Sequence, residues 1–469
     1  MGMPPTRALG LSETHTMDSE GHHGWCREGV RGTGSTPSAR LWPGTREAGT
    51  ERVEPSPHDF GLTPDGLLSY CVARGGQPMA TWDLKDKAAV CGVGHSPYGR
   101  RLNRSPLDLA GEALRNALDD AGLGREDLDG LIVSFGTPIG VDADTLAYVL
   151  GLKLTMYNQT WAHGRFTASC IQWAAMAVTA GLAKAVACLA ALSFSGVRRP
   201  MMGGAGDHEG AREAGGGHGE DPVFGMTSPG AGAALVAQKY FTRFGATSRQ
   251  LAAVPVAFRK HASLNPVAIM RAPITAEDHQ HSRLVCAPLH LLDYCLINDG
   301  AACVIVTTSE RARDLQKLPV YLSGMQGLPG GRDEFIWAYP GFGTAQQEVF
   351  AYQPGLQHVY QMAGVTPADI DAFFTYDAFS ILAWMALERF GFCSPGEAAA
   401  FTQEGRIELG GALPMNTNGG LLAEGHIMGW NHQVEIVRQL RGECGPRQVV
   451  NARIIQWANA YGDSLIYRR

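Results

Sequence analysis

The chain has 469 residues, of which 45% are hydrophobic and 18% are charged, and its formal net charge is −6. This length suffices for one large core or two domains, and the acidic balance argues against a general nucleic-acid binder. A membrane-spanning helix needs about 20 consecutive apolar residues. The nearest run, residues 175–197, is interrupted by Gly181 and Lys184. We therefore expect a chain without a membrane span.

The ten cysteines are scattered along the chain without a CxxC pair. Most lie in apolar runs, as expected for buried free thiols in a reducing cytoplasm. The pattern indicates neither a disulfide framework nor a zinc site, so we predict a cytoplasmic protein without a bound metal. The cysteines are Cys26, Cys71, Cys91, Cys170, Cys188, Cys286, Cys295, Cys303, Cys393 and Cys444.

The N-terminal segment differs from the rest of the chain. Residues 1–86 mix Gly, Pro, Ser, Thr and Arg without apolar periodicity. Such a segment cannot bury enough surface to offset the entropy of ordering it, and it lacks the apolar core of a signal peptide. We predict a disordered or non-native extension. Met79, just before the first expected strand, is a candidate native start, so residues 1–78 are expected to be dispensable.

Strands and helices alternate from Ala88 onward. Residues 88–94 are predicted to form a strand, and residues 105–123 an amphipathic helix that Ser105 caps and Gly122 ends. This alternation predicts a mainly parallel sheet with both faces covered. The elements expected next are a strand over 128–135, a short helix over 145–150, a buried helix over 166–183 and a strand over 184–194.

A glycine-rich, charged segment at residues 201–225 interrupts this pattern. No GK[ST] follows it, so it predicts a surface loop rather than a phosphate-binding loop. Residues 226–285 are expected to form helices and loops that cover a site. We place the first domain at 87–318, with the insertion at 196–285, and the second domain at 319–469.

The second domain repeats a feature of the first. Asp-Leu-Asp at 127–129 and Asp-Ile-Asp at 369–371 each follow a helix-start signal and lead into an apolar strand. The two segments occupy similar places in their halves. This weak internal repeat predicts a duplicated α/β unit.

Four segments carry a resemblance to a known family. They are SRLVCAPLHLLDYCLINDGAACVIVT at 282–307, GFCSPGEA at 391–398, LPMNTNGGLLAEGH at 413–426 and VRQLRG at 437–442. Over residues 87–469 the chain resembles the thiolase superfamily, specifically the sterol-carrier-protein-type thiolases and the thiolase-like lipid-transfer proteins. The resemblance implies a duplicated thiolase fold (five-layered αβαβα), an obligate homodimer, and a coenzyme A thioester as substrate, with no cofactor bound in the chain.

Both cysteines of the thiolase reaction are missing. The position of the nucleophile matches Gly164, beside His163, and the late Cys-x-Gly motif matches residues 458–462, which hold no cysteine. Cys170 lies six residues after Gly164, and its helical companions Ala174 and Ala177 indicate a core position. Without the nucleophile, no acyl-enzyme is expected at the usual place.

Groups that move protons are nevertheless retained. The family's Asn-Glu-Ala-Phe or His-Asp-Cys-Phe motif matches residues 376–379, where Tyr376 can act as a general base. The Gly-His-Pro-x-Gly motif matches residues 425–429, where His426 can donate to an enolate or relay a proton. The resemblance implies that the site is lined by His163, Gly164, Asp377, Asn416, Gly419, Gly420 and Gly425.

Structural roles compete with these assignments. A tyrosine at a strand end is often simply half-buried, and His426 between two glycines can cap a turn. The glycines of the Asn416–Gly420 turn can serve only to allow close approach of the backbone.

The retained groups fit retro-aldol cleavage of a β-hydroxyacyl-CoA, and the resemblance implies a role in lipid or steroid catabolism. The chain is similar to steroid side-chain-cleaving retro-aldolases, which carry a tyrosine at position 376 and a second tyrosine where this chain has His426. Those enzymes work with a small partner that has an OB fold and a zinc ribbon. An acyl-CoA acyltransferase with a displaced thiol and a non-catalytic acyl-CoA or lipid carrier or scaffold subunit remain alternatives. The sequence does not identify the acyl group of the substrate.

Overall fold

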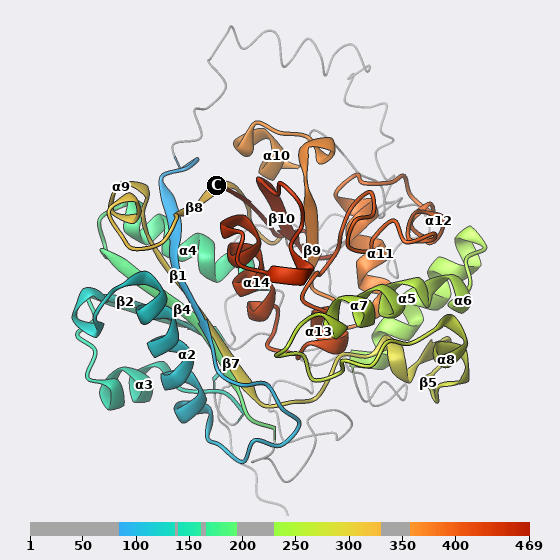
Figure 1. Ribbon diagram of the computed structural model, residues 1–469, viewed down its shortest axis with the longest axis horizontal. Helices are drawn as coiled ribbons and strands as arrows, with labels where there is room; N and C mark the ends of the chain where they lie inside the picture. The colour runs from blue at the N-terminus through green and yellow to red at the C-terminus, as the bar shows by residue number, and fades with distance from the viewer. Residues whose placement is uncertain (1–83, 137–138, 161–165, 195–228, 330–356) are drawn as a thin grey trace, which may run out of the picture. The chain divides into compact units, whose positions relative to one another are not determined.

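The computed structural model describes residues 84–136, 139–160, 166–194, 229–329 and 357–469 (Figure 1). The expectations for the N-terminal extension at 1–83, for His163 and Gly164, and for the loop at 201–225 therefore lie outside the described residues.

Within the described ranges, nine strands form one mixed sheet, and the first half of the chain supplies five of them in the order β3-β2-β4-β7-β1. Strand β2 pairs in parallel with β3 and β4, whereas β7 runs antiparallel to both β4 and β1. The strands are β1 (Ala88–His95), β2 (Gly130–Ser134), β3 (Met156–Thr160), β4 (Ala185–Leu192) and β7 (Gly300–Thr308).

The second half repeats this order as β8-β11-β10-β9. Strand β10 pairs in parallel with β9, and β11 runs antiparallel to β10 and β8. The halves join where Ala89 and Val90 of β1 pair with Tyr321 and Val320 of β8. These strands are β8 (Val320–Gln326), β9 (Ala372–Thr375), β10 (Ile454–Ala458) and β11 (Ser464–Arg468), and β5 (Leu284–Cys286) and β6 (Leu289–His290) form a separate small sheet.

The expectation of a mainly parallel sheet was wrong for one strand in each half, β7 and β11. The physical reason is clearest at β11, which follows β10 after residues 459–463. Antiparallel strands can be joined by so short a turn, but a parallel crossover needs a dozen residues or more.

The two Asp-x-Asp segments make equivalent hydrogen bonds in the two halves. Asp129 Oδ1 accepts hydrogen bonds from the backbone N–H of Lys184 (2.7 Å) and Ala185 (3.1 Å) at the start of β4. Asp371 Oδ2 accepts from the corresponding groups of Arg453 (2.7 Å) and Ile454 (2.9 Å) at the start of β10. Short 3₁₀ helices precede them, η2 (Arg125–Asp127) and η8 (Pro367–Asp369). The expected duplication is therefore confirmed.

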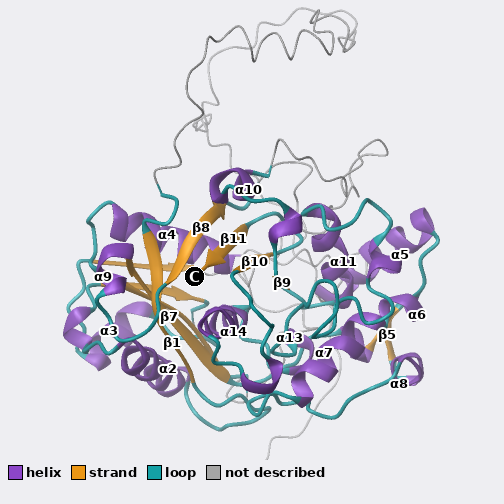
Figure 2. Cartoon of the chain, turned by 45° about the horizontal axis from the view of Figure 1, so that its top comes forward, coloured by secondary structure: helices purple, strands orange, loops and turns teal. Residues whose placement is uncertain are grey.

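Helices cover the sheet in layers (Figure 2). Alternate residues of β1 enter different cores: Ala89 and Cys91 pack with α2, and Val90 and Val93 pack with α4. Helix α14 contacts β1 and β7 of the first half and β9 and β10 of the second, so it lies between the halves. Outside them, α10 packs on β8 and β11. The helices are α2 (Pro106–Ala121), α3 (Ala143–Leu150), α4 (Thr167–Thr179), α9 (Ser309–Arg313), α10 (His358–Ala363) and α14 (Trp430–Arg441).

Helices also fill the segment between β4 and β7, as expected, and they pack beside the second half. Helix α7 contacts α13, and α5 contacts α11. The helices of this region are α5 (Pro229–Phe244), α6 (Ser248–Leu251), α7 (Ala253–Ser263), α8 (Ala276–His281), α11 (Ser380–Arg389), α12 (Ala398–Phe401) and α13 (Gly420–Ala423). Short 3₁₀ turns are η5 (Leu291–Asp293) and η9 (Gly445–Arg447).

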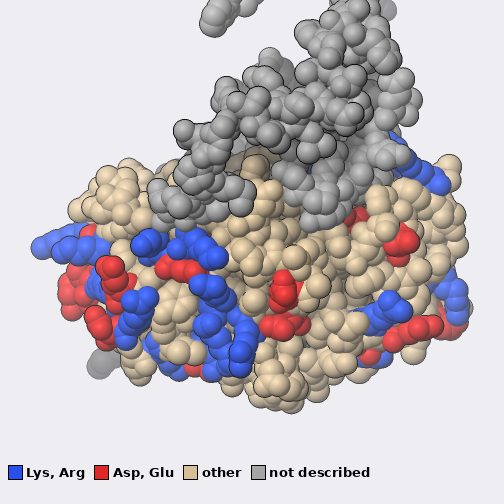
Figure 3. Space-filling view, turned by 90° about the horizontal axis from the view of Figure 1, so that it is seen from above, with Lys and Arg blue, Asp and Glu red and all other residues tan. Residues whose placement is uncertain are grey.

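Charges of both signs mingle at the left of Figure 3, on the side where Figure 1 places α2, α3 and α9. Arg441 pairs with Asp120 at 2.7 Å and Arg311 with Asp127 at 3.0 Å, which ties α14 to α2 and α9 to η2. Across the described ranges, we find no helix with the length and apolar character needed to cross a membrane.

Candidate active site

The two expected catalytic side chains meet at the end of β9. Tyr376 directly follows this strand, and His426 lies in the loop between α13 and α14. The Tyr376 hydroxyl is 3.2 Å from His426 Nε2, and the ring centres are 6.1 Å apart. Tyr376 is buried and His426 is half-buried. The structure thus brings together two residues that are 50 positions apart, hereafter the Tyr–His pair.

The surroundings of His426 favour a neutral ring. Burial lowers the pKa of His426 to about 4, although the Asp377 charge and a hydrogen bond to the Leu296 backbone both raise it. A backbone group that favours the protonated ring is a carbonyl, which accepts an imidazole N–H. Because Nε2 faces Tyr376, this N–H is assigned to Nδ1, and the Nε2 lone pair is left to accept the phenol proton.

A cysteine stands on the other side of the imidazole. Cys295 Sγ lies 3.5 Å from His426 Nδ1, and Asn298 Oδ1 accepts a hydrogen bond from the His426 backbone N–H at 2.6 Å. Burial, with a smaller contribution from Asp377, raises the pKa of Cys295 to about 12, so the thiol is protonated at neutral pH. Sequence reasoning missed both residues. The only local signal was their place in the DYCLINDG segment.

Asp377 links the strand end to α13. Its carboxylate accepts hydrogen bonds from the backbone N–H of Leu421 (3.0 Å) and Leu422 (3.3 Å). His432 Nε2 lies 3.3 Å from Asp377 Oδ1, and both side chains are fully buried. A Cβ on Gly420 would lie 2.1 Å from Asp377 Oδ2, so only glycine fits there. His432 is a second residue that sequence reasoning did not find.

Asn416 holds the glycine turn against the same strand. Its side chain accepts a hydrogen bond from Thr375 N at 2.8 Å and donates one to Thr375 O at 3.0 Å. Its φ of 41° and those of Gly419 (104°) and Gly420 (66°) are left-handed, which explains an Asn and two glycines in this turn.

Gly425 and its neighbour Glu424 complete the loop before His426. A Cβ on Gly425 would contact Tyr98 at 3.4 Å. Glu424 accepts hydrogen bonds from the side-chain amides of Asn265 (2.9 Å), Asn431 (2.6 Å) and Asn418. Burial raises the pKa of Glu424 to about 7, with a smaller increase from the Glu435 charge and a partial offset by these amides.

The N-terminus of α4 contacts the loop that carries His426. Thr167 Oγ1 donates a hydrogen bond to Met428 O at 2.6 Å, two residues after His426. Further along this helix, Cys170 is fully buried in the apolar core. Burial raises the pKa of Cys170 to about 12. These properties agree with the expected core position and leave this thiol unsuited to attack a substrate.

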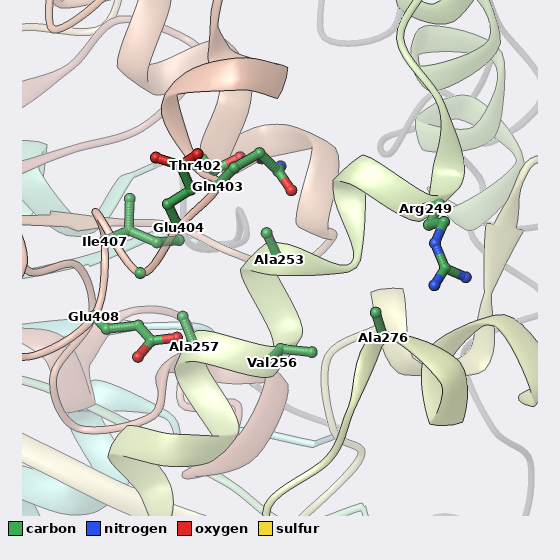
Figure 4. A pocket seen from close by; sticks show the side chains of 11 residues that line it. Arg249, Ala253, Val256, Ala257, Ala276, Thr402, Gln403, Glu404, Ile407 and Glu408 are labelled. Carbon is green, nitrogen blue, oxygen red and sulfur yellow. Dashed lines mark hydrogen bonds between the residues drawn. The ribbon is translucent and has the colours of Figure 1, made fainter.

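A cavity of about 180 Å³ lies apart from these residues, between α6, α7 and the segment after α12 (Figure 4). Figure 4 shows Arg249 at one side and Glu408 at the other, with Ala253, Val256 and Ala257 between them. Arg249 is paired with Glu277, and Glu408 with Lys260. Both charged side chains at the sides of the cavity are thus paired with other residues. Among the described residues, no cluster of His, Cys, Asp or Glu is suited to hold a metal.

Comparisons with known proteins point in one direction. Residues 347–464 match the family described as thiolase C-terminal domain-like. The chain is 37% identical over 378 residues to the 17-hydroxy-3-oxo-4-pregnene-20-carboxyl-CoA lyase of Mycobacterium tuberculosis, covering 76% of this chain and 92% of the relative. It is also 37% identical over 371 residues to the steroid side-chain-cleaving aldolase of Thermomonospora curvata, covering 76% and 91%. Among solved structures, an Ltp2-ChsH2(DUF35) aldolase aligns with a TM-score of 0.73 at 34% identity, covering 82% of this chain and 98% of the other.

Proposed function

We propose that this chain, which belongs to the thiolase superfamily and to its group of steroid side-chain-cleaving aldolases, cleaves a β-hydroxyacyl-CoA by a retro-aldol reaction. The observation that carries the proposal is the 3.2 Å contact between Tyr376 and His426. A retro-aldol step needs a base for the β-hydroxyl proton and does not need a covalent intermediate. The relatives named above, a CoA-ester lyase and an aldolase, support the same reaction class.

In the proposed mechanism, the Tyr376 oxygen takes the proton of the substrate β-hydroxyl while the phenol proton passes to His426 Nε2. The Cα–Cβ bond breaks, and its electron pair forms the thioester enolate as the β-carbon becomes a carbonyl. The enolate α-carbon then takes a proton back through the same pair. No net proton is gained or lost, and both residues return to their starting forms. This modifies the sequence expectation, since His426 first accepts a proton and only then can donate to the enolate.

The test is a direct assay of carbonyl product from a branched or steroid-like β-hydroxyacyl-CoA. Removing a general base costs roughly 10²–10⁴ in rate. Tyr376→Phe and His426→Ala are therefore expected to lose most turnover while CoA binding, measured by calorimetry, stays nearly intact. Cys170→Ser is the control and should change only stability. Full activity of Tyr376→Phe would contradict the proposal.

An acyltransferase is the second candidate, favoured by the 3.5 Å contact between Cys295 Sγ and His426 Nδ1. A thiol beside an imidazole is the arrangement of an activated nucleophile. The raised pKa of Cys295 argues against it, and so does the N–H assigned to His426 Nδ1, because a nitrogen that carries a proton cannot accept one from the thiol. Cys295→Ser separates the two functions, because the retro-aldolase should retain turnover and the transferase should lose it. If no variant matters because the wild type turns over nothing, the carrier alternative stands.

We also propose that the chain acts as a homodimer. Strand β3 lies at the end of the sheet order, where its outer edge has no neighbouring strand among the described residues. Tyr157 on this strand is 53% exposed, and Tyr148 on the adjacent α3 is 87% exposed. An open edge beside exposed aromatic rings fits pairing with a second copy. Light scattering at micromolar concentration should give a dimer, which Tyr148→Glu with Tyr157→Lys should dissociate. Val450→Lys, at another exposed apolar position, should not.

We further propose a small partner protein with an OB fold and a zinc ribbon. Support comes from the family resemblance and from the solved aldolase, whose name joins Ltp2 to ChsH2(DUF35). Co-expression with such a protein, encoded beside this chain, should give a stable complex with higher turnover than the chain alone. Equal turnover with and without the partner would argue against this assignment.

A further inference from the structure

The loop that follows His426 has a backbone conformation that one of its residues does not favour. Met428 has a φ of 53° and Gly429 a φ of 85°, so two consecutive residues are left-handed just before α14 begins at Trp430. Glycine adopts this conformation freely, but methionine rarely does, because its Cβ lies too close to the following carbonyl oxygen. Such a residue persists only where its surroundings fix it, and such residues gather at functional sites.

A side chain from the first half of the chain fixes the Met428 backbone. Thr167, at the start of α4, donates a hydrogen bond from its Oγ1 to Met428 O at 2.6 Å, across 261 positions of the sequence. Thr167 is fully buried and Met428 is 4% exposed, so this bond lies away from solvent. A buried hydrogen-bonding group is costly to leave without its partner. Thr167 therefore ties the left-handed residue to α4.

The same residues lie against the side chain of Tyr376. A Cβ placed on Gly429 would lie 3.5 Å from Tyr376 Cδ2 and 3.7 Å from Thr167 Oγ1, so the glycine backbone packs against both. Met428 Sδ lies 4.0 Å from the Tyr376 hydroxyl, which also lies 3.2 Å from His426 Nε2. The phenol oxygen thus lies between a thioether and an imidazole.

These two neighbours of the hydroxyl differ in their capacity to accept a proton. A thioether sulfur is a weak acceptor, whereas the free nitrogen of a neutral imidazole is a good one. Met428 therefore occupies the space beside the hydroxyl without competing for its proton, which is left to His426. Transfer between positioned groups depends on their separation, and a misplacement of about 1 Å can cost on the order of 100-fold in rate.

We infer that Thr167 holds Met428 in its left-handed conformation, so that the Met428 thioether keeps the Tyr376 hydroxyl against His426. Thr167 and Met428 are then positioning residues, because they act through Tyr376 and exchange no proton themselves. The inference rests on the proposed function and adds two residues that the mechanism above does not use.

The test is the measurement of kcat and KM for β-hydroxyacyl-CoA cleavage by Thr167→Val, which replaces the hydroxyl with a methyl group of similar size. We expect kcat to fall roughly tenfold or more while KM stays within about twofold, because the lost bond fixes the loop rather than the substrate. Thr167→Ser keeps the hydroxyl and should retain kcat within about threefold. Met428→Ala removes the thioether and should lower kcat by roughly tenfold, again with little change in KM.

Two controls separate this role from a structural one. Thr307→Val removes a matched hydrogen bond, since Thr307 is also fully buried and its Oγ1 donates to Lys184 O at 2.6 Å in the sheet. Met362→Ala removes a matched side chain, since Met362 on α10 is also 4% exposed. Both variants should lose stability comparable to that of the Thr167 and Met428 variants in thermal melts, and both should keep the wild-type kcat.

A double variant shows whether Thr167 acts through the phenol. Thr167→Val added to Tyr376→Phe should cause no further loss of the residual rate, measured at high enzyme concentration, because residues that act on one group are not additive. A further loss of roughly tenfold would mean that Thr167 acts elsewhere, and would overturn the inference.

Failure of this inference can be told apart from failure of the proposed function. A wild-type kcat in Thr167→Val, or equal losses of kcat in Thr167→Val and Thr307→Val, overturns this inference alone, provided that Tyr376→Phe loses most turnover in the same assay. If Tyr376→Phe is fully active, the proposed function falls and this inference with it.

Discussion

Asn416→Ala tests how the glycine turn is fixed to the strand that carries Tyr376. The wild-type amide makes two hydrogen bonds to the Thr375 main chain, at 2.8 and 3.0 Å, and is fully buried. Alanine would leave a buried N–H and a buried C=O without these bonds, at roughly 1–3 kcal/mol each. The φ of 41° adds about 1 kcal/mol, because alanine tolerates the left-handed region less well than asparagine.

These contributions total roughly 3–7 kcal/mol, a large share of the roughly 5–15 kcal/mol that stabilises an ordinary domain. Urea unfolding followed by fluorescence should show the loss as a lower midpoint with an unchanged slope. Asn416→Gly keeps the backbone conformation, so its difference from Asn416→Ala isolates the left-handed cost. Turnover should fall as well, because Thr375 directly precedes Tyr376.

Asn451→Ala is the matched control for this experiment. Asn451 has a φ of 58° but is exposed. Asn451→Ala should therefore lower the free energy of unfolding by about 1 kcal/mol or less, from the backbone conformation alone. If Asn416→Ala costs no more than Asn451→Ala, then the hydrogen bonds to Thr375 do not hold the turn, and the reasoning is wrong.

Three further predictions concern the same region. Gly420→Ala should abolish activity or soluble expression, since its Cβ would lie 2.1 Å from Asp377 Oδ2, whereas Gly442→Ala, with no neighbour within 4 Å, should cost only about 1 kcal/mol in thermal melts. The pKa of Glu424 in the folded state is raised from 4.5 to about 7, so ionisation of this side chain destabilises the folded protein. The free energy of unfolding should therefore fall by on the order of 3 kcal/mol as the pH rises between these values. Glu424→Gln should remove this pH dependence, as measured by urea unfolding at pH 5 and 8. Because the pKa of His426 is lowered to about 4, wild-type kcat/KM should stay flat from pH 7 to about 5, and a limb near 6.5 would contradict the neutral imidazole.

Local features of the fold followed closely from the sequence. Helix α2 begins after Ser105, whose Oγ accepts from Asp108 N at 3.1 Å, and ends at Gly122 with a φ of 69°, as the capping pattern predicted. The Asp-x-Asp repeat was also readable. The antiparallel direction of β7 was not, because periodicity describes a strand's faces and says nothing about which neighbour it pairs with. The domain boundaries at 318 and 319 stay a prediction.

Some residues of the candidate site could likewise be predicted from the sequence, and others could not. Tyr376, His426, Asp377 and the glycine turn could be identified from the sequence through the family resemblance, because each belongs to a short segment that matches a motif of the family. Cys295 and His432 do not belong to a segment that could be recognised in this way. Cys295 and His426 are 131 positions apart in the sequence, and only tertiary packing brings them into contact. The physical reason is the distance along the sequence over which each feature is determined. Caps and turns depend on neighbours within a few residues. Ring tautomers and buried charges depend on groups that distant strands and helices bring into contact.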